Sequence, residues 1–293
     1  MISAMSERDE DIDAPRGIDL ESPSVARVYD YFLGGCTNWA IDRAFGDMIL
    51  QGFPVLRDIA VANRLFMHRV VRHLVRLGVR QIVDVGSGAP TMGAAHQVAQ
   101  ELDSEVNVVY IDRDPIAVAH SRLLLDQTGD PRRHVAIEAD LREPDRLWQK
   151  MLATELVDPD EPIALLLIAV LHIQQFDKNG SEIGPEAVAR YRELLPTGSF
   201  LAVSHITDDG VPEEIFSKLV ALRCRCASSS SPMIWRSRDD IGALLGNFTH
   251  LSPGMCWTPL WYPEATDSLS QDSPFTSPSE SATWAGVGHK RSA

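Results

Sequence analysis

The sequence lacks the features that mark several common classes of protein. It has four cysteines among 293 residues, at positions 36, 224, 226 and 256. None of them has the paired spacing of a metal site, and so few predict reduced thiols rather than a disulfide framework. No cluster of His, Asp or Glu has metal-ligand spacing either, so we expect no bound metal.

Positive charge is also scarce, with 27 Lys and Arg against 41 Asp and Glu and a formal net charge of −14. Nucleic-acid partners require a basic footprint, and the one basic cluster, residues 69–80, is interpreted as the solvated face of a helix. The longest apolar run, Ile163–Leu171, is too short to span a bilayer. The acidic N-terminus lacks the apolar core of a signal peptide. We therefore expect a cytoplasmic protein that binds neither nucleic acid nor a membrane.

The chain divides by composition into three parts. Residues 1–21 are acidic, with little to bury, and are predicted to be disordered. Residues 22–78 hold two amphipathic helices, the first ending at Gly34-Gly35 and the second covering 55–77. This helical extension is either a lid over a pocket or a packing arm. Residues 79–293 form the core.

The core alternates apolar strands with amphipathic helices, which predicts an α/β fold with a mainly parallel sheet. Strands are expected at 81–85, 107–111, 133–138, 163–170, 199–204, 249–251, 257–261 and 284–289. The most apolar of these, 163–170, is expected at the centre of the sheet. Residues 263–281 are rich in Ser, Asp, Glu and Pro and are interpreted as a mobile connection.

The first core strand ends in the turn Gly86-Ser87-Gly88, and a helix is expected from Pro90. Glycines permit a tight turn and let a ligand approach the backbone. Asp84 lies within this strand, Asp112 ends the second and Asp140 follows the third. Because ligands bind at the carboxyl ends of parallel strands, these acids are candidates for one binding site. Alternatively, each serves as a turn or capping residue, as expected for Asp114 before the helix at Pro115.

The spacing of these acids suits an adenosine. A carboxylate at the end of the second strand, here Asp112, can accept both ribose hydroxyls. Asp140 can accept from the adenine amino group while Leu141 packs against the ring. A dinucleotide is disfavoured, because Thr91 replaces the third glycine and Pro90 offers no N–H to a pyrophosphate. S-adenosyl-L-methionine therefore fits better than NAD.

Several longer motifs carry a family resemblance. They are Ser22-Pro-Ser-Val-Ala-Arg-Val-Tyr-Asp-Tyr-Phe-Leu-Gly-Gly35, Asp84-Val-Gly-Ser-Gly-Ala-Pro-Thr91, Val109-Tyr-Ile-Asp-Arg-Asp-Pro115 and Ala139-Asp-Leu-Arg142. Together they resemble the bacterial S-adenosylmethionine-dependent methyltransferases first catalogued as a domain of unknown function. The resemblance implies a Rossmann-like, seven-stranded class I methyltransferase sheet with an N-terminal helical extension. It also implies a reversed last strand at 284–289 and a lid at 22–42 that covers the cofactor.

The resemblance implies a set of cofactor contacts. They are Asp84, Gly86, Ser87, Gly88, Asp112, Arg113, Asp140, Leu141, Ala169 and Val170 in the core, with Tyr29, Gly35 and Asn38 in the lid. Asn63, on the apolar face of the second helix, is either a structural hydrogen-bond partner or a further contact. After Leu171-His172 the chain reads Ile-Gln-Gln-Phe-Asp, where the family has a second His and a Pro-Asp pair.

The expected function is methyl transfer from S-adenosylmethionine to oxygen or nitrogen of a small molecule, by direct displacement. His172 and His205, at the exits of the fourth and fifth core strands, are candidate bases, or else structural residues. The alternatives are a protein that binds S-adenosylmethionine or S-adenosylhomocysteine without turnover and a nicotinamide-dependent oxidoreductase. The acceptor and the oligomeric state are left open by the sequence.

Overall fold

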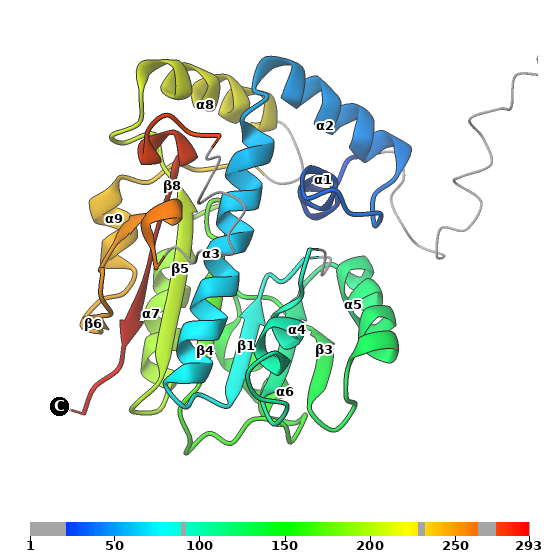
Figure 1. The fold of residues 1–293 in the computed structure, drawn as a ribbon, viewed down its shortest axis with the longest axis vertical. Helices are drawn as coiled ribbons and strands as arrows, with labels where there is room; N and C mark the ends of the chain where they lie inside the picture. The colour runs from blue at the N-terminus through cyan, green and yellow to red at the C-terminus, as the bar shows by residue number, and fades with distance from the viewer. Residues whose placement is uncertain (1–21, 89–91, 228–231, 263–273, 293) are drawn as a thin grey trace, which may run out of the picture.

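The computed structural model describes residues 22–88, 92–227, 232–262 and 274–292 (Figure 1). The predicted disorder of residues 1–21 and the first part of the expected mobile connection, 263–273, lie outside the described residues, as does Pro90 itself. The last part of that connection is packed: Phe275 is buried, and Pro278–Ser281 form a 3-10 helix, η2.

The described residues form a mixed α/β fold. The helices are α1 (Val25–Phe32), α2 (Ala40–Gly52), α3 (Leu56–Arg76), α4 (Ala95–Gln100), α5 (Pro115–Thr128), α6 (Pro144–Leu152), α7 (Gly184–Leu194), α8 (Glu213–Cys226) and α9 (Arg238–Ala243), with a 3-10 helix η1 (Thr258–Leu260). The strands are β1 (Gln81–Val85), β2 (Asn107–Asp112), β3 (His134–Glu138), β4 (Ala164–Ile168), β5 (Phe200–Ile206), β6 (Thr249–His250), β7 (Cys256–Trp257) and β8 (Thr283–His289).

The strands join in the order β3-β2-β1-β4-β5-β8-β6, with β7 beside β8. Strands β1 to β5 are parallel, whereas β8 runs antiparallel to β5, which confirms the reversed last strand. β4 lies at the middle of this order, as its apolar sequence predicts. In the described residues the sheet has eight strands rather than seven, because β6 and β7, of two residues each, both pair with β8.

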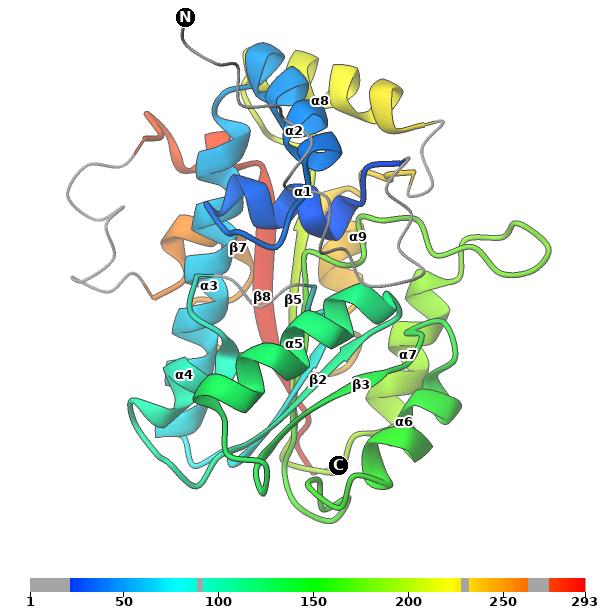
Figure 2. The ribbon, with the colours of Figure 1, turned by 90° about the vertical axis from the view of Figure 1, so that its right-hand side faces the viewer.

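Side-chain alternation along the strands builds two apolar layers. Figure 2 shows the helices that cover the two faces of the sheet. Ile82 packs with α3 and α4 on one face of the sheet, and Val83 packs with α6 and α7 on the other. Helix α3 contributes residues to two different apolar clusters. From Phe66 onward it belongs to the core of the sheet, and its earlier part packs with α1 and α2.

A third apolar cluster lies beyond the carboxyl ends of the parallel strands, where α1, α2, α8 and the start of α3 meet (Figure 1). We call these four segments the cap. Helix α2 is not among the predicted elements, although two signals mark it. Asp42 accepts a hydrogen bond from the backbone N–H of Trp39, and Phe45 and Ile49 lie four residues apart on one face.

Three further expectations were wrong. Helix α4 begins at Ala95 rather than Pro90, because Met92 and Gly93 have positive φ angles that a right-handed helix cannot contain. Arg69 is buried rather than solvated: its guanidinium donates to the carbonyl oxygens of Trp261 and Thr258, both at 2.7 Å. Of the predicted strand 257–261 only Trp257 is extended, and η1 follows it.

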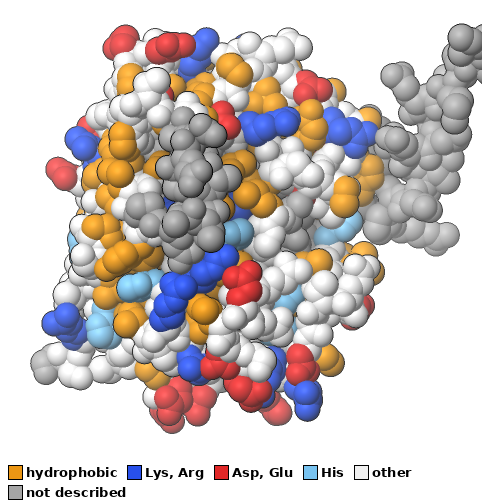
Figure 3. All heavy atoms as spheres, in the orientation of Figure 1, with side chains coloured by type: hydrophobic (Ala, Val, Ile, Leu, Met, Phe, Trp, Pro, Cys, Tyr) orange, Lys and Arg blue, Asp and Glu red, His pale blue; other side chains and the backbone are white. Residues whose placement is uncertain are grey.

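The surface carries its charge unevenly. Figure 3 shows acidic side chains gathered at the lower end of the molecule, away from the cap, and basic side chains scattered among other types. In the part of the chain that the structure describes, no helix combines the length and the apolar character needed to cross a membrane.

Candidate functional site

A cavity of about 200 Å³ lies where β1, β2 and β4 end, under α1. We call it the strand-end cavity. Eleven of the sixteen predicted site residues line it: Tyr29, Asp84, Gly86, Ser87, Gly88, Asp112, Arg113, Leu141, Ala169, Val170 and His172. The parallel pairing explains why they meet, since it brings the ends of neighbouring strands to one edge of the sheet.

The glycine turn gives the cavity its floor. The backbone N–H groups of Gly86 and Ser87 donate to the carbonyl oxygen of Ile111, which ties the turn to β2. Gly86 has a φ of +70°, and a Cβ there would lie 2.3 Å from Val170 Cγ2. Glycine is thus required both by conformation and by the close approach of the loop after β4.

Asp112 ends β2 with its carboxylate held in place. Gly88 N–H donates to one oxygen and Asp114 N–H to the other, each at 2.9 Å. Burial raises the pKa of Asp112, and these backbone hydrogen bonds act against that rise. Asp114 itself caps α5 through Ile116 N–H, as expected. Each oxygen of Asp112 keeps acceptor capacity for a ligand, since a carboxylate offers about four lone-pair positions.

Asp84 is buried beside a positive charge, that of Arg64, which is not among the predicted site residues. Burial raises its pKa to about 6, and the nearby Arg64 guanidinium opposes that shift. Arg64 lies on α3, is buried and lines the strand-end cavity, and it makes no hydrogen bond to any described residue. The sequence signal for it was available: it follows Asn63, in the buried part of the helix.

His172 follows β4 and lines two cavities at once. It borders the strand-end cavity and a second, smaller one inside the cap, and its Nδ1 is buried without a hydrogen-bond partner. Burial, with the charge of Arg236, lowers the pKa of His172 to about 4. The ring is therefore neutral at physiological pH and has one nitrogen able to accept a hydrogen bond.

The structure does not bring His205 to the strand-end cavity. It is fully buried behind His172, and both of its ring nitrogens are engaged. Nδ1 lies 2.6 Å from the Ile206 carbonyl oxygen, and Nε2 lies 2.7 Å from an Arg236 nitrogen that can donate to it. A histidine bonded in this way holds its neighbours in place and has no nitrogen left for a substrate.

Four other predicted residues also lie outside the strand-end cavity. Asp140 faces a neighbouring polar depression, where the Arg142 guanidinium occupies its carboxylate at 2.5 to 3.0 Å. Gly35 and Asn38 are in the turn between α1 and α2. Asn63 lines the second cavity instead. The pattern of acids at strand ends places Asp140 in the right region but does not reveal its pairing with Arg142.

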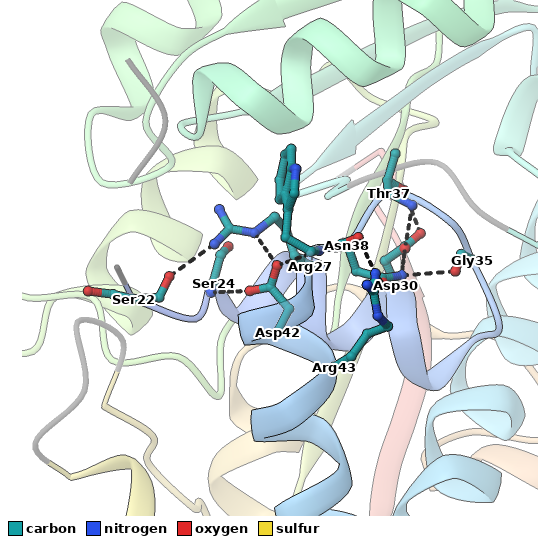
Figure 4. Close-up of polar contacts among 10 residues, drawn as sticks. Ser22, Ser24, Arg27, Asp30, Gly35, Thr37, Asn38, Asp42 and Arg43 are labelled. Atoms are coloured by element: carbon teal, nitrogen blue, oxygen red, sulfur yellow. Dashed lines mark hydrogen bonds and ion pairs between the residues drawn. The ribbon is translucent and has the colours of Figure 1, made fainter. Parts of the chain in front are cut away.

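The lid segment is held together by two buried carboxylates (Figure 4). Asp42 accepts from Arg27 Nε at 2.6 Å and from Ser24 N–H at 2.9 Å. Asp30 accepts from Asn38 Nδ2 at 2.7 Å and from Thr37 Oγ1 at 2.6 Å. These contacts fix α1 against the turn and α2, and α1 then supplies Tyr29 to both cavities.

Among the described residues there is no group of three or more His, Cys, Asp or Glu side chains that could hold a metal ion. The charged residues that do converge on the strand-end cavity are Arg64, Asp84, Asp112, Arg113 and Asp114. Both signs of charge are therefore present, which suits a zwitterionic ligand.

Comparison with known proteins identifies the class of cofactor that this protein uses. The family model described as S-adenosyl methyltransferase matches residues 11–291. The chain belongs to the S-adenosyl methyltransferase family. Membership makes the protein a methyltransferase with S-adenosylmethionine as its cofactor.

Two solved structures from actinobacteria support the family membership. A protein from Thermobifida fusca, named as a candidate methyltransferase, is 31% identical, with a TM-score of 0.82 over 96% of this chain and 100% of its own. A DUF574 family protein from Streptomyces avermitilis is 30% identical, with a TM-score of 0.80 over 92% of this chain and 98% of its own. Both therefore cover the cap as well as the sheet. A search of curated proteins finds no match.

A more distant structure shares the fold alone. An O-methyltransferase family protein from Burkholderia thailandensis is 13% identical, with a TM-score of 0.50 over 86% of this chain and 60% of its own. The predicted class of sheet is thereby confirmed.

Proposed function

We propose that this methyltransferase acts on a small molecule, at oxygen or nitrogen, with its cofactor held in the strand-end cavity. The observation that carries the proposal is the position of His172. Its neutral imidazole lies in the wall between the strand-end cavity, where the carboxylates of Asp84 and Asp112 converge, and a second cavity that is almost wholly apolar.

The residues of the strand-end cavity fit S-adenosylmethionine. We assign the two ribose hydroxyls to the Asp112 carboxylate, whose oxygens keep acceptor capacity. We assign the carboxylate of the amino-acid end to Arg64 and its ammonium group to Asp84, because this buried pair offers both charges. Leu141 supplies an apolar surface for the adenine ring. The buried Ser87 hydroxyl, which has no partner among the described residues, is available to the same ligand.

The chemistry asks little of the protein beyond alignment. When bound, S-adenosylmethionine supplies a methyl group that a nucleophile takes by displacing a neutral thioether, so the nucleophile gains a C–O or C–N bond and releases one proton. His172 accepts a hydrogen bond from the O–H or N–H of the acceptor and so directs its lone pair. With a pKa of about 4, the imidazole is too weak a base to keep the proton, which passes to solvent.

The proposed function is tested by calorimetric titration with S-adenosylmethionine and S-adenosylhomocysteine, with NADH as the control. We expect micromolar binding of the two sulfur compounds and none of NADH. A folded sample that binds neither sulfur compound would contradict the assignment of the cavity. The cytoplasmic location stays a prediction of the sequence.

A further inference from the structure

The second cavity lies within the cap and has a volume of about 80 Å³. We call it the cap cavity. Its wall comes from α1, α2, α3 and α8, with contributions from β5, β8 and the loop after β4. Aliphatic and aromatic side chains dominate it, and no Asp, Glu, Lys or Arg occurs among its described lining residues.

Three residues that line the cap cavity each carry a buried polar atom without a partner in the described part of the chain. Asn63 Oδ1, His172 Nδ1 and Thr283 Oγ1 are all buried, and none has a hydrogen-bond partner among the described residues. A buried polar group without a partner loses its hydration and gains no hydrogen bond in return, which is unfavourable. Three such atoms around one cavity indicate that a ligand supplies the missing partners, since proteins rarely leave buried groups unpaired.

The chemistry of the Asn63 side chain shows which partner it needs. The Tyr29 hydroxyl donates its proton to the Ala60 carbonyl oxygen at 3.2 Å. It must therefore accept the bond that joins it to Asn63 at 3.0 Å, and only the Nδ2 of the amide can donate there. The orphan atom of Asn63 is thus the carbonyl oxygen, Oδ1, which only a hydrogen-bond donor can satisfy.

We propose that the cap cavity binds the methyl acceptor, and that this acceptor is an uncharged, largely apolar molecule whose hydroxyl or N–H group donates to Asn63 Oδ1. The inference rests on the proposed function and names the substrate class for it. A charged acceptor would lose its hydration in this cavity without meeting an opposite charge, which is strongly unfavourable.

The size of the cap cavity limits the acceptor further. Its 80 Å³ is smaller than the roughly 150 Å³ of an apolar cavity known to admit benzene. A single aromatic ring is therefore too large for the cap cavity alone and reaches past the residues that separate it from the strand-end cavity. Val25, Tyr29, Ala169 and His172 line both cavities and form the wall between them. The nucleophile is a different group of the acceptor from the one that donates to Asn63, and it lies beside His172, where the cofactor's methyl group is expected.

Four one-ring compounds test the charge and size of the acceptor. Phenol, toluene, benzoate and benzylamine are titrated by ligand-observed NMR against protein saturated with S-adenosylhomocysteine. We expect phenol and toluene to bind at least tenfold more tightly than benzoate and benzylamine. Equal or tighter binding of either charged ring overturns the inference, and so does the failure of both neutral rings to bind.

Two substitutions locate the binding within the cap cavity. Ala60→Leu fills the cavity from α3 and is expected to weaken phenol and toluene alike by tenfold or more. Asn63→Leu removes Oδ1 and is expected to weaken phenol about tenfold while toluene stays within twofold. Arg146→Ala, at an exposed ion pair that lines neither cavity, is the control and should leave phenol and toluene within twofold.

Each result separates this inference from the proposed function. If S-adenosylhomocysteine itself does not bind, the proposed function fails. If it binds to all variants within threefold but Ala60→Leu leaves phenol affinity unchanged, the cap cavity is not the acceptor site. If Asn63→Leu weakens toluene as much as phenol, Asn63 acts through packing and the hydrogen-bond assignment is wrong.

Discussion

The strand-end cavity and the cap cavity share a wall but differ in almost every other respect. The first gathers charged groups of both signs, including Arg64, Asp84 and Asp112. The second has no charged side chain among its described lining residues and three polar atoms without partners. The difference has a structural origin: parallel strands present their ends at one edge, whereas the cap packs amphipathic helices face to face. One cavity is thus suited to a zwitterionic cofactor and the other to a neutral acceptor.

The largest expected effect is on cofactor binding in the strand-end cavity. Asp112→Ala should weaken S-adenosylhomocysteine binding about 100-fold, because it removes the acceptor assigned to two ribose hydroxyls at roughly 1.5 kcal/mol or more each. Asp140→Ala is the matched control, with an expected change within threefold, since Arg142 already occupies that carboxylate. Calorimetric titration of both variants with S-adenosylhomocysteine shows which of the two carboxylates contacts the cofactor. A loss as large for Asp140→Ala would place the adenine there, as the strand-end pattern predicts.

Arg64 provides the second test. Arg64→Met keeps the length of the side chain but removes its charge, and should weaken S-adenosylhomocysteine binding about 30-fold, the value of a charge-assisted hydrogen bond. The control is a ligand rather than a variant: 5′-methylthioadenosine has no amino-acid end, so its affinity should stay within twofold. If both ligands weaken together, Arg64 supports the cavity without contacting the carboxylate.

The pH dependence of cofactor binding tests Asp84. Burial raises the pKa of Asp84 to about 6, so the carboxylate that we assign to the ammonium group is ionised above pH 6 and becomes protonated below it. The affinity for S-adenosylhomocysteine should therefore fall about tenfold between pH 7 and pH 5.

Arg64 and Asp112 also act on this titration, so a variant must isolate it. Asp84→Asn should bind more weakly at pH 7 and lose most of the slope between pH 7 and pH 5. A slope that persists in Asp84→Asn would assign the titration to another group, such as Asp112.

The smallest expected effect concerns the lid. Asn38→Ala removes the hydrogen bonds that join Asp30, the Gly35 carbonyl and the turn before α2, although Asn38 itself touches neither cavity. Looser seating of α1 should speed cofactor release about threefold in stopped-flow measurements, with little change in the association rate. Arg146→Ala, at an exposed ion pair far from the lid, is the control. An unaltered release rate would show that the segment only packs.

The two histidines show where prediction from sequence stops. Both follow core strands at the ligand edge, and the sequence does not distinguish them. Their difference comes from Arg236, a residue 31 positions beyond His205, which engages one ring and leaves the other without a partner. A hydrogen-bond partner so far away in the sequence leaves no pattern near the histidine from which it could be predicted.

Sequence patterns point to most of the residues that the structure gathers around the strand-end cavity. The central position of β4, the glycine turn and the position of Asp112 follow from apolar periodicity and from residues at strand ends. These signals are local, because each strand and its terminal residue are contiguous in the chain. The eleven predicted residues that line the strand-end cavity come almost entirely from such segments.

By itself, then, the sequence determined the α/β sheet, its parallel core and the cofactor class. Only the tertiary structure decided that Arg64 enters the strand-end cavity, that Asp140 is paired with Arg142, and that an apolar cavity exists inside the cap. The physical reason is that the cap cavity is bounded by segments from Val25 to Thr283, each of which is an ordinary amphipathic element. Their apolar faces predict burial, but what they enclose depends on how they pack together.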